Sequence, residues 1–251
     1  MKQVPVTYFD PARHPGRVDR VDYGRKYALV YTPQGKAKNI LYLIHGGGGD
    51  QQAFFCTRFL NMIDNMIENG DLEPLYIVSP TYYDPDETDK TPANSGIAVE
   101  KFSRELREEI IPRVEAFCGL KAERTQRAVG GFSMGGVATW YAFLQALDLF
   151  YWFMPLSGDC WICGEKGGGD KPEGTARLLA EAAKEDFRIH AVTGTKDIAF
   201  PNLDPQIQAM RAFPQAFRFG ENIRYDLLEG GVHDYETIFR YIFNALPGFF
   251  H

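Results

Sequence analysis

The residues with the most evident chemistry form a G-x-S-x-G pattern at positions 131–135, with Ser133 at its centre. A predicted strand at 127–130 leads into the pattern, and a predicted helix at 137–142 follows it. In this strand, turn and helix context the serine hydroxyl is exposed on a tight turn, and the helix N-terminus beneath it stabilises negative charge. Glycines are expected on both sides because β-carbons there would collide with the neighbouring backbone. Ser133 is therefore the candidate nucleophile.

A serine hydroxyl needs a base, normally a histidine that is itself oriented by a carboxylate. Around a turn of this kind the partners follow in the order serine, acid, histidine. Of the five histidines, His14 and His45 precede Ser133, His190 lies within a predicted strand, and His251 is the last residue. His233 remains, between a predicted strand and the last predicted helix, and is the candidate base.

Two aspartates are candidates for the acid that orients His233. Asp197 follows a predicted strand at 189–193, and Asp159 follows one at 152–156. We favour Asp197 because a loop one strand before the histidine can reach its far nitrogen, and Asp159 is the alternative. Asp234, next to His233, is expected to cap the last helix.

A glycine-rich loop at 45–49 directly follows a continuous apolar run at 40–44. Glycines leave backbone N–H groups unobstructed, and a tetrahedral intermediate needs such donors for its oxyanion. We expect the N–H of Met134 and one N–H from Gly46 or Gly47 to form this oxyanion hole; the pattern does not choose between the two glycines. The alternative is a phosphate-binding loop, but neither G-x-x-x-x-G-K-[ST] nor G-x-G-x-x-G occurs.

The elements that must position these residues follow from the apolar patterning. Polar and apolar residues alternate at 17–23 and 26–32 around a glycine, which predicts an antiparallel hairpin. Further apolar runs predict strands, and apolar residues spaced by three or four between 99 and 117 predict a helix. The additional strands are expected at 40–44, 75–78, 127–130, 152–156, 189–193 and 223–228. This alternation indicates an α/β fold with a mostly parallel central sheet, helices on both faces and an antiparallel N-terminal hairpin. The serine motif and the order of its partners favour the α/β-hydrolase type of this fold.

Two segments read as long loops, at 81–96 and 158–174. Both follow predicted parallel strands and should emerge at the carboxyl edge of the sheet, where α/β proteins bind ligands. Trp161, Tyr82 and Tyr83 lie on these loops, and flat aromatic side chains suit an aromatic substrate.

Composition limits the protein class. The 251 residues, 45% of them hydrophobic, fit one domain spanning 1–251, since no repeat or linker divides the chain. A net charge of -6 argues against nucleic acid or an anionic membrane as partner. The N-terminus lacks the apolar region of a signal peptide, so we expect a cytoplasmic protein or a mature or excised domain of a secreted one. No His/Cys set has zinc-ligand spacing, so no metal or cofactor is expected, and nothing indicates an oligomeric state.

Together these motifs resemble the feruloyl esterases of carbohydrate esterase family 1, which are related more distantly to esterase D and the mycolyltransferases. The resemblance covers residues 17–250 and rests on four blocks in family order, at 45–49, 131–136, 194–197 and 230–235. The segment 155–161 looks like the one that supplies a tryptophan beside the substrate ring in clostridial xylanase-linked feruloyl esterase modules. The resemblance implies roles for five residues: Ser133 as nucleophile, His233 as base, Asp197 as acid, Met134 as oxyanion donor and Trp161 as substrate contact.

We therefore expect a serine carboxylester hydrolase that releases ferulic or related hydroxycinnamic acids from arabinoxylan-type polysaccharide or its feruloylated oligosaccharides. Trp161, Tyr82, Tyr83 and Asp159 are the expected substrate contacts. Two alternatives remain: an esterase D-like enzyme acting on short acyl esters or S-formylglutathione, and a non-catalytic binding module on a hydrolase scaffold.

Overall fold

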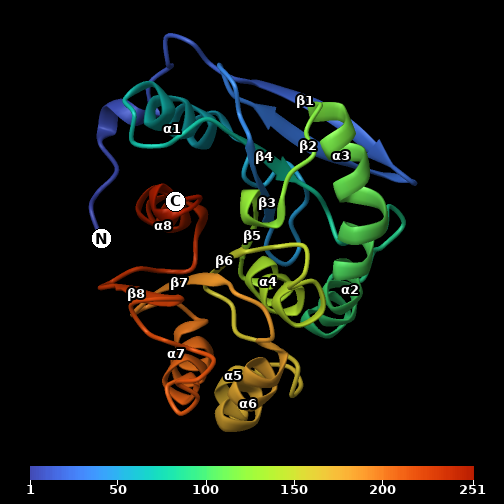
Figure 1. Cartoon of the computed structure of the whole chain (residues 1–251), viewed down its shortest axis with the longest axis vertical. Helices are drawn as coiled ribbons and strands as arrows, with labels where there is room; N and C mark the ends of the chain where they lie inside the picture. The colour runs from blue at the N-terminus through green and yellow to red at the C-terminus, as the bar shows by residue number, and fades with distance from the viewer.

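An eight-stranded sheet runs through the computed structural model, which describes residues 1–251 (Figure 1). Its order is β1-β2-β4-β3-β5-β6-β7-β8. The β1–β2 and β2–β4 pairs are antiparallel, and all pairs from β4 through to β8 are parallel. The strands are β1 (Arg17–Tyr23), β2 (Lys26–Thr32), β3 (Asn39–Ile44), β4 (Leu75–Ser79), β5 (Arg127–Phe132), β6 (Trp152–Leu156), β7 (Arg188–Gly194) and β8 (Ile223–Leu228).

All eight predicted strands are present, and the N-terminal hairpin, β6 and β8 have the predicted bounds. The others extend the predicted runs by a residue or two at one or both ends. Every residue of β3 is buried, as its continuous apolar run indicated.

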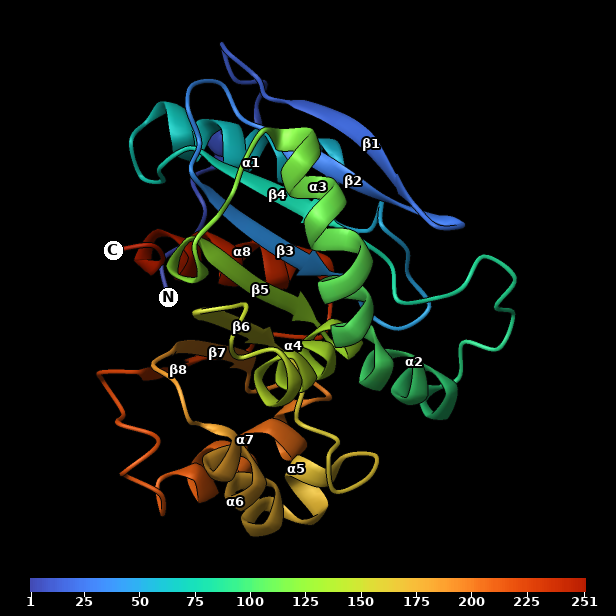
Figure 2. The ribbon, with the colours of Figure 1, turned by 45° about the vertical axis from the view of Figure 1, so that its right-hand side comes forward.

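Helices cover both faces of the sheet (Figure 2). α1 and α8 pack on one face, and α2, α3 and α4 pack on the other, which α6 and α7 extend. The helices are α1 (Thr57–Glu68), α2 (Pro92–Glu105), α3 (Ile111–Cys118), α4 (Met134–Gln145), α5 (Gly167–Asp170), α6 (Pro172–Ala182), α7 (Phe200–Met210) and α8 (Tyr235–Ala245), with shorter turns η1 (Val6–Phe9), η2 (Leu106–Ile110), η3 (Arg124–Gln126) and η4 (Leu246–Gly248). None of the helices combines the length and the apolar character needed to cross a bilayer.

The core divides into two layers because β-strand side chains alternate between faces. In β3, Ile40 and Tyr42 contribute to a cluster of 41 buried residues under α2–α4, α6 and α7. Leu41 and Leu43 contribute to a cluster of 25 buried residues under α1 and α8. The fold is therefore the predicted α/β arrangement.

Three segments differ from the sequence-based predictions. The helix expected over 99–117 consists of α2, the π-helical turn η2 and α3; Pro112, near the start of α3, has no N–H to continue the regular ladder. The loop expected to reach residue 96 ends at Thr91, the N-cap of α2, and residues 92–96 are already helical. The loop expected over 158–174 contains α5 and the first turn of α6.

The glycine run at 167–169 is helical because it packs closely against α7. A β-carbon on Gly168 would lie 2.7 Å from the Asp159 β-carbon and 3.0 Å from the Asn202 carbonyl oxygen. Glycine therefore permits this contact and brings α5 into the packed structure.

Candidate active site

Ser133 lies on the turn between β5 and α4, in a strained backbone conformation with a positive φ of 56° and a ψ of −116°. Gly131 and Gly135 make the turn possible. A β-carbon would lie 2.5 Å from the Ile44 carbonyl oxygen at Gly131, and 2.0 Å from that oxygen at Gly135. The turn is thus pressed against the end of β3, which confirms the expected reason for the two glycines and leaves the serine side chain free.

The structure brings Ser133, His233 and Asp197 together in one hydrogen-bonded chain. His233 Nε2 lies 3.0 Å from Ser133 Oγ, and His233 Nδ1 lies 2.7 Å from Asp197 Oδ1. A carboxylate only accepts, so Nδ1 carries the proton and Nε2 is free to accept the serine proton. This is the geometry that a nucleophile, a base and an orienting acid require.

Asp197 is held by more than the histidine. Its side chain is buried, Oδ1 also accepts from the Ala199 N–H at 2.8 Å, and Oδ2 accepts from Ser157 Oγ at 2.7 Å. These donors fix the carboxylate plane and stabilise its charge. Ser157 was not singled out from the sequence; its place directly after β6, next to β7, is the signal that could have identified it.

Asp159, the alternative acid, points elsewhere. Its Oδ1 accepts from Trp161 Nε1 at 3.2 Å, and its Oδ2 accepts from the Gly168 N–H at 2.9 Å. Burial raises the pKa of this carboxyl. Since neither oxygen contacts His233, the structure favours Asp197 as the partner of the histidine. Asp234 is the predicted helix cap, and accepts from the Thr237 N–H at 2.7 Å.

A cavity of about 600 Å³ opens above Ser133 and His233. Trp161 and Asp159, two of the expected substrate contacts, line it together with Gly47 and Met134. Further lining residues were not singled out from the sequence, among them Lys90, Val137, Lys166, Ile198, Pro201 and Asn202. Ile198 is 72% exposed although apolar, and it directly follows Asp197, so its place next to the acid is a signal in the sequence.

The two candidate oxyanion glycines differ in the structure. The Gly46 N–H donates to the Tyr235 hydroxyl at 3.3 Å, and Gly46 does not line the cavity. The Gly47 N–H has no hydrogen-bond partner in the protein, and Gly47 lines the cavity beside Met134, the first residue of α4. The geometry therefore favours Gly47 as the second donor.

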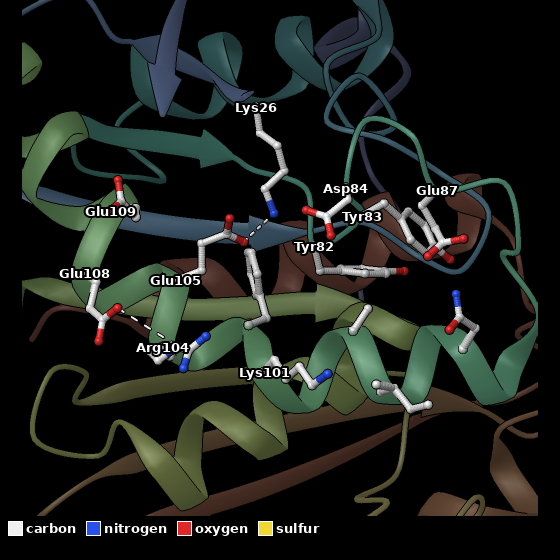
Figure 3. Close-up of a pocket in the computed structure, with 14 residues that line it drawn as sticks. Lys26, Tyr82, Tyr83, Asp84, Glu87, Lys101, Arg104, Glu105, Glu108 and Glu109 are labelled. Atoms are coloured by element: carbon white, nitrogen blue, oxygen red, sulfur yellow. Dashed lines mark hydrogen bonds and ion pairs between the residues drawn. The ribbon is translucent and has the colours of Figure 1, made fainter. Parts of the chain in front are cut away.

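Tyr82 and Tyr83 do not line this cavity, which corrects their assignment as substrate walls. Both side chains are about 4% exposed, and both line a separate polar cavity of about 420 Å³ beside α2 (Figure 3). In Figure 3 the Tyr82 ring extends away from the Lys26–Glu105 ion pair, and it stacks on His45 at a centroid distance of 4.5 Å. Packing against this buried imidazole turns the rings inward.

His45 is fully buried between the glycine loop at 45–49 and the loop that follows β4. Its Nδ1 donates to the Gly46 carbonyl at 2.8 Å, and its Nε2 accepts from the Thr81 hydroxyl at 2.9 Å. Burial lowers the pKa of His45 from 6.5 to about 4, because the charged imidazolium would lose its hydration. His45 is thus a neutral structural link beneath the oxyanion loop.

This shift predicts a pH-dependent stability. Between pH 6.5 and 4 the unfolded chain binds a proton at His45 that the folded chain does not. The contribution of His45 to the free energy of unfolding is therefore complete above pH 6.5 and is lost as the pH falls toward 4. The free energy of unfolding should drop by about 2 kcal/mol between pH 7 and pH 5 through this residue. Urea unfolding at both pH values measures it. The variant His45→Gln should lose this part of the slope, whereas His251→Gln, exposed in both states, should keep it. Equal slopes in all three proteins would contradict the assignment.

A model of the putative esterase family matches residues 24–246. The chain belongs to this family. Over its full length this family member is 36% identical to endo-1,4-beta-xylanase Y of Acetivibrio thermocellus, and it covers 24% of that protein. It is 29% identical to an endo-1,4-beta-xylanase/feruloyl esterase of Xylanibacter ruminicola over 66% of this chain and 26% of that protein. The chain thus spans about a quarter of the length of these curated relatives.

Solved structures agree with the family. The feruloyl esterase module from Clostridium thermocellum, in a mutant complexed with sinapinate, is 34% identical, with a TM-score of 0.83 over 100% of this chain and 93% of that one. A CE1 ferulic acid esterase from Anaeromyces mucronatus in complex with ferulic acid has a TM-score of 0.78 at 20% identity, over 100% of this chain and 98% of that one, and shows the shared fold. The α/β-hydrolase fold and the resemblance to feruloyl esterases, both inferred from the sequence, are confirmed.

Proposed function

We propose that this chain is a serine carboxylester hydrolase that releases ferulic or related hydroxycinnamic acids from feruloylated arabinoxylan-type polysaccharide or oligosaccharides. The observation that carries the proposal is the hydrogen-bonded chain Ser133–His233–Asp197 at the base of a cavity with an aromatic wall. The choice of acyl group is supported by the similarity to the feruloyl esterase module that was solved with sinapinate. We further propose that residues 1–251 act as one catalytic domain.

The reaction follows from the positions of the hydrogen-bonded groups. His233 Nε2 takes the proton of Ser133 as Oγ attacks the ester carbonyl, and Asp197 stabilises the imidazolium that forms. The N–H groups of Met134 and Gly47 receive the developing oxyanion. Collapse of the tetrahedral intermediate expels the sugar alcohol, which takes the proton from His233. Water then attacks the feruloyl-enzyme in the same way, and the free acid leaves.

The aromatic acyl group is proposed to lie against Trp161. The indole is fixed on two sides: its Nε1 donates to Asp159, and its ring packs on Gly96, where a β-carbon would lie 3.1 Å away. Val137 and Ile198 add apolar surface to the same cavity. A flat wall held in place loses little entropy when a planar ring stacks on it. Asp159, which also lines the cavity, stays a predicted substrate contact.

The test compares methyl ferulate with methyl butyrate. Both esters release methanol, so the ratio of their kcat/KM values reports on the acyl group alone. We expect a clear preference for methyl ferulate. A higher kcat/KM for methyl butyrate or S-formylglutathione would favour the esterase D-like alternative, and turnover of no ester at all would favour the non-catalytic binding module.

The substitution Trp161→Ala should reduce kcat/KM for methyl ferulate by about 10- to 100-fold, because it removes one wall of the acyl site. The kcat/KM for methyl butyrate should change less than about threefold, since the short butyryl chain has no ring to stack on the indole. Trp161→Phe, which keeps a flat ring, is the matched control and should retain most of the activity. Equal losses on both esters would show that Trp161 supports the fold of the site and not the acyl group.

A further inference from the structure

Two tyrosine hydroxyls hold the glycine loop that follows β3. The Gly46 N–H donates to Tyr235 at 3.3 Å, and the Gly48 N–H donates to Tyr83 at 3.1 Å. The amide between them, on Gly47, has no hydrogen-bond partner in the protein and lies at the cavity above Ser133. The free amide is thus flanked on both sides by amides that are already fixed.

The two tyrosines come from different parts of the fold, and each is anchored. Tyr235 is the first residue of α8, and its ring packs against Phe132 and Phe54 at centroid distances of 5.1 Å and 5.2 Å. Tyr83 follows β4, is nearly fully buried, and shares a hydrogen bond of 2.6 Å with Ser95 Oγ on α2. Each hydroxyl is therefore a rigid acceptor.

The other hydrogen bonds that hold the glycine loop converge on one carbonyl, that of Gly46. Four consecutive glycines, at 46–49, have the widest choice of backbone conformations, and Gly48 has a φ of 74°. Within the loop the Gly49 N–H donates to the Gly46 carbonyl at 3.1 Å, and that carbonyl also accepts from His45. Because the Gly46 carbonyl and the Gly47 N–H belong to one planar trans peptide unit, these bonds also set the tilt of the Gly47 N–H, and the two tyrosine hydroxyls hold the peptide units on either side of it.

We propose that Tyr83 and Tyr235 are positioning residues that direct the Gly47 N–H toward the oxyanion. The inference rests on the proposed function, since it assigns the two hydroxyls to the hydrolytic site. An oxyanion donor acts only if it is oriented before the charge develops, because reorientation during the reaction would cost the free energy that the donor supplies. Tyr235 also lies two residues after His233, so one short segment carries the base and holds the loop of the oxyanion donor.

The substitutions Tyr83→Phe and Tyr235→Phe test this directly, because each removes one oxygen atom and keeps the ring. We expect kcat for methyl ferulate to fall by about 10-fold in each and by up to about 100-fold in the double variant, since outright loss of one oxyanion donor costs about 100- to 1,000-fold. KM should stay within about twofold of the wild-type value, because the hydroxyls do not line the substrate cavity. Tyr42→Phe is the matched control: its buried hydroxyl on β3 has no hydrogen-bond partner, and kcat should not change.

A second readout separates positioning from folding. A boronic acid forms a tetrahedral adduct with a catalytic serine and needs the oxyanion hole, so its affinity should fall in proportion to kcat in both variants. Ferulate binding to the same variants in a Ser133→Ala background should be unchanged. Loss of thermal stability together with unchanged kcat and boronic acid affinity would overturn the proposal and leave the tyrosines a structural role.

The same variants assayed with p-nitrophenyl acetate distinguish this inference from the choice of substrate. The oxyanion hole serves any ester, so the same fall in kcat is expected there even if the feruloyl assignment fails. Wild-type kcat in both variants, with Ser133→Ala inactive, would overturn the positioning role and leave the proposed function standing. Absence of turnover of every ester by the wild-type protein would overturn both.

Discussion

Replacing Ser133 with alanine is expected to lower kcat for methyl ferulate by at least about 10⁴-fold, because the acyl-enzyme can no longer form. No second hydroxyl stands in for it. Two other serines line the cavity, but the Ser157 hydroxyl donates to Asp197 at 2.7 Å and the Ser95 hydroxyl shares a hydrogen bond of 2.6 Å with Tyr83. The residual rate over water should come from the oxyanion hole and substrate binding alone. Release of ferulate, followed by absorbance over hours, measures the loss.

The control for this prediction is Ser103→Ala. Ser103 is a buried serine on α2 whose hydroxyl has no hydrogen-bond partner, so its removal should leave kcat unchanged. Thermal unfolding of both variants checks that the fold is intact. Hydrolysis at the wild-type rate by Ser133→Ala would contradict the nucleophile assignment.

The second large effect is expected for Asp197→Asn, with a fall in kcat of about 10³- to 10⁴-fold. An asparagine side chain can present its N–H₂ group to His233 Nδ1, and the histidine would then carry its proton on Nε2, where it cannot accept one from Ser133. The Ser157 hydroxyl and the Ala199 N–H, which donate to the carboxylate, would lose part of the charge they stabilise. Steady-state kinetics from pH 5 to pH 9 measures the loss.

Asp159→Asn is the matched control, because Asp159 is equally buried and also lines the cavity. Its carboxylate contacts Trp161 and Gly168 and not His233, so kcat should fall far less, and the effect should appear in KM for methyl ferulate. A large loss of kcat in Asp159→Asn with normal kcat in Asp197→Asn would transfer the acid role to Asp159.

The fold was predictable in detail because central strands of a parallel sheet covered on both faces are continuous apolar runs. β3 and β6 are such runs, and the edge strand β8, although it carries Arg224 and Asp226, also has the predicted bounds. The helix expected over 99–117 shows where the pattern is insufficient. Its apolar spacing does not report the π-helical turn at 106–110, which depends on a proline in the following turn.

Side-chain direction on loops was not predictable. Tyr82 and Tyr83 lie on the expected loop, but a loop has no period that tells which side chains face a cavity. Only packing against the buried His45 turns them away from Ser133. The same limit applies to Asp159 and Asp197, which both follow neighbouring strands and differ only in which partners the folded loops bring within hydrogen-bond distance.

The sequence by itself was sufficient to predict the candidate serine, the candidate histidine and the glycine loop at 45–49, since tight turns and strand ends carry local residue signals. Only the tertiary structure favours Gly47 over Gly46 as the second candidate oxyanion donor. The hydroxyl that occupies the Gly46 amide belongs to Tyr235, which is 189 residues further along the chain. A contact at that separation arises because the first residue of α8 packs on Phe132 at the end of β5, and no local pattern contains it.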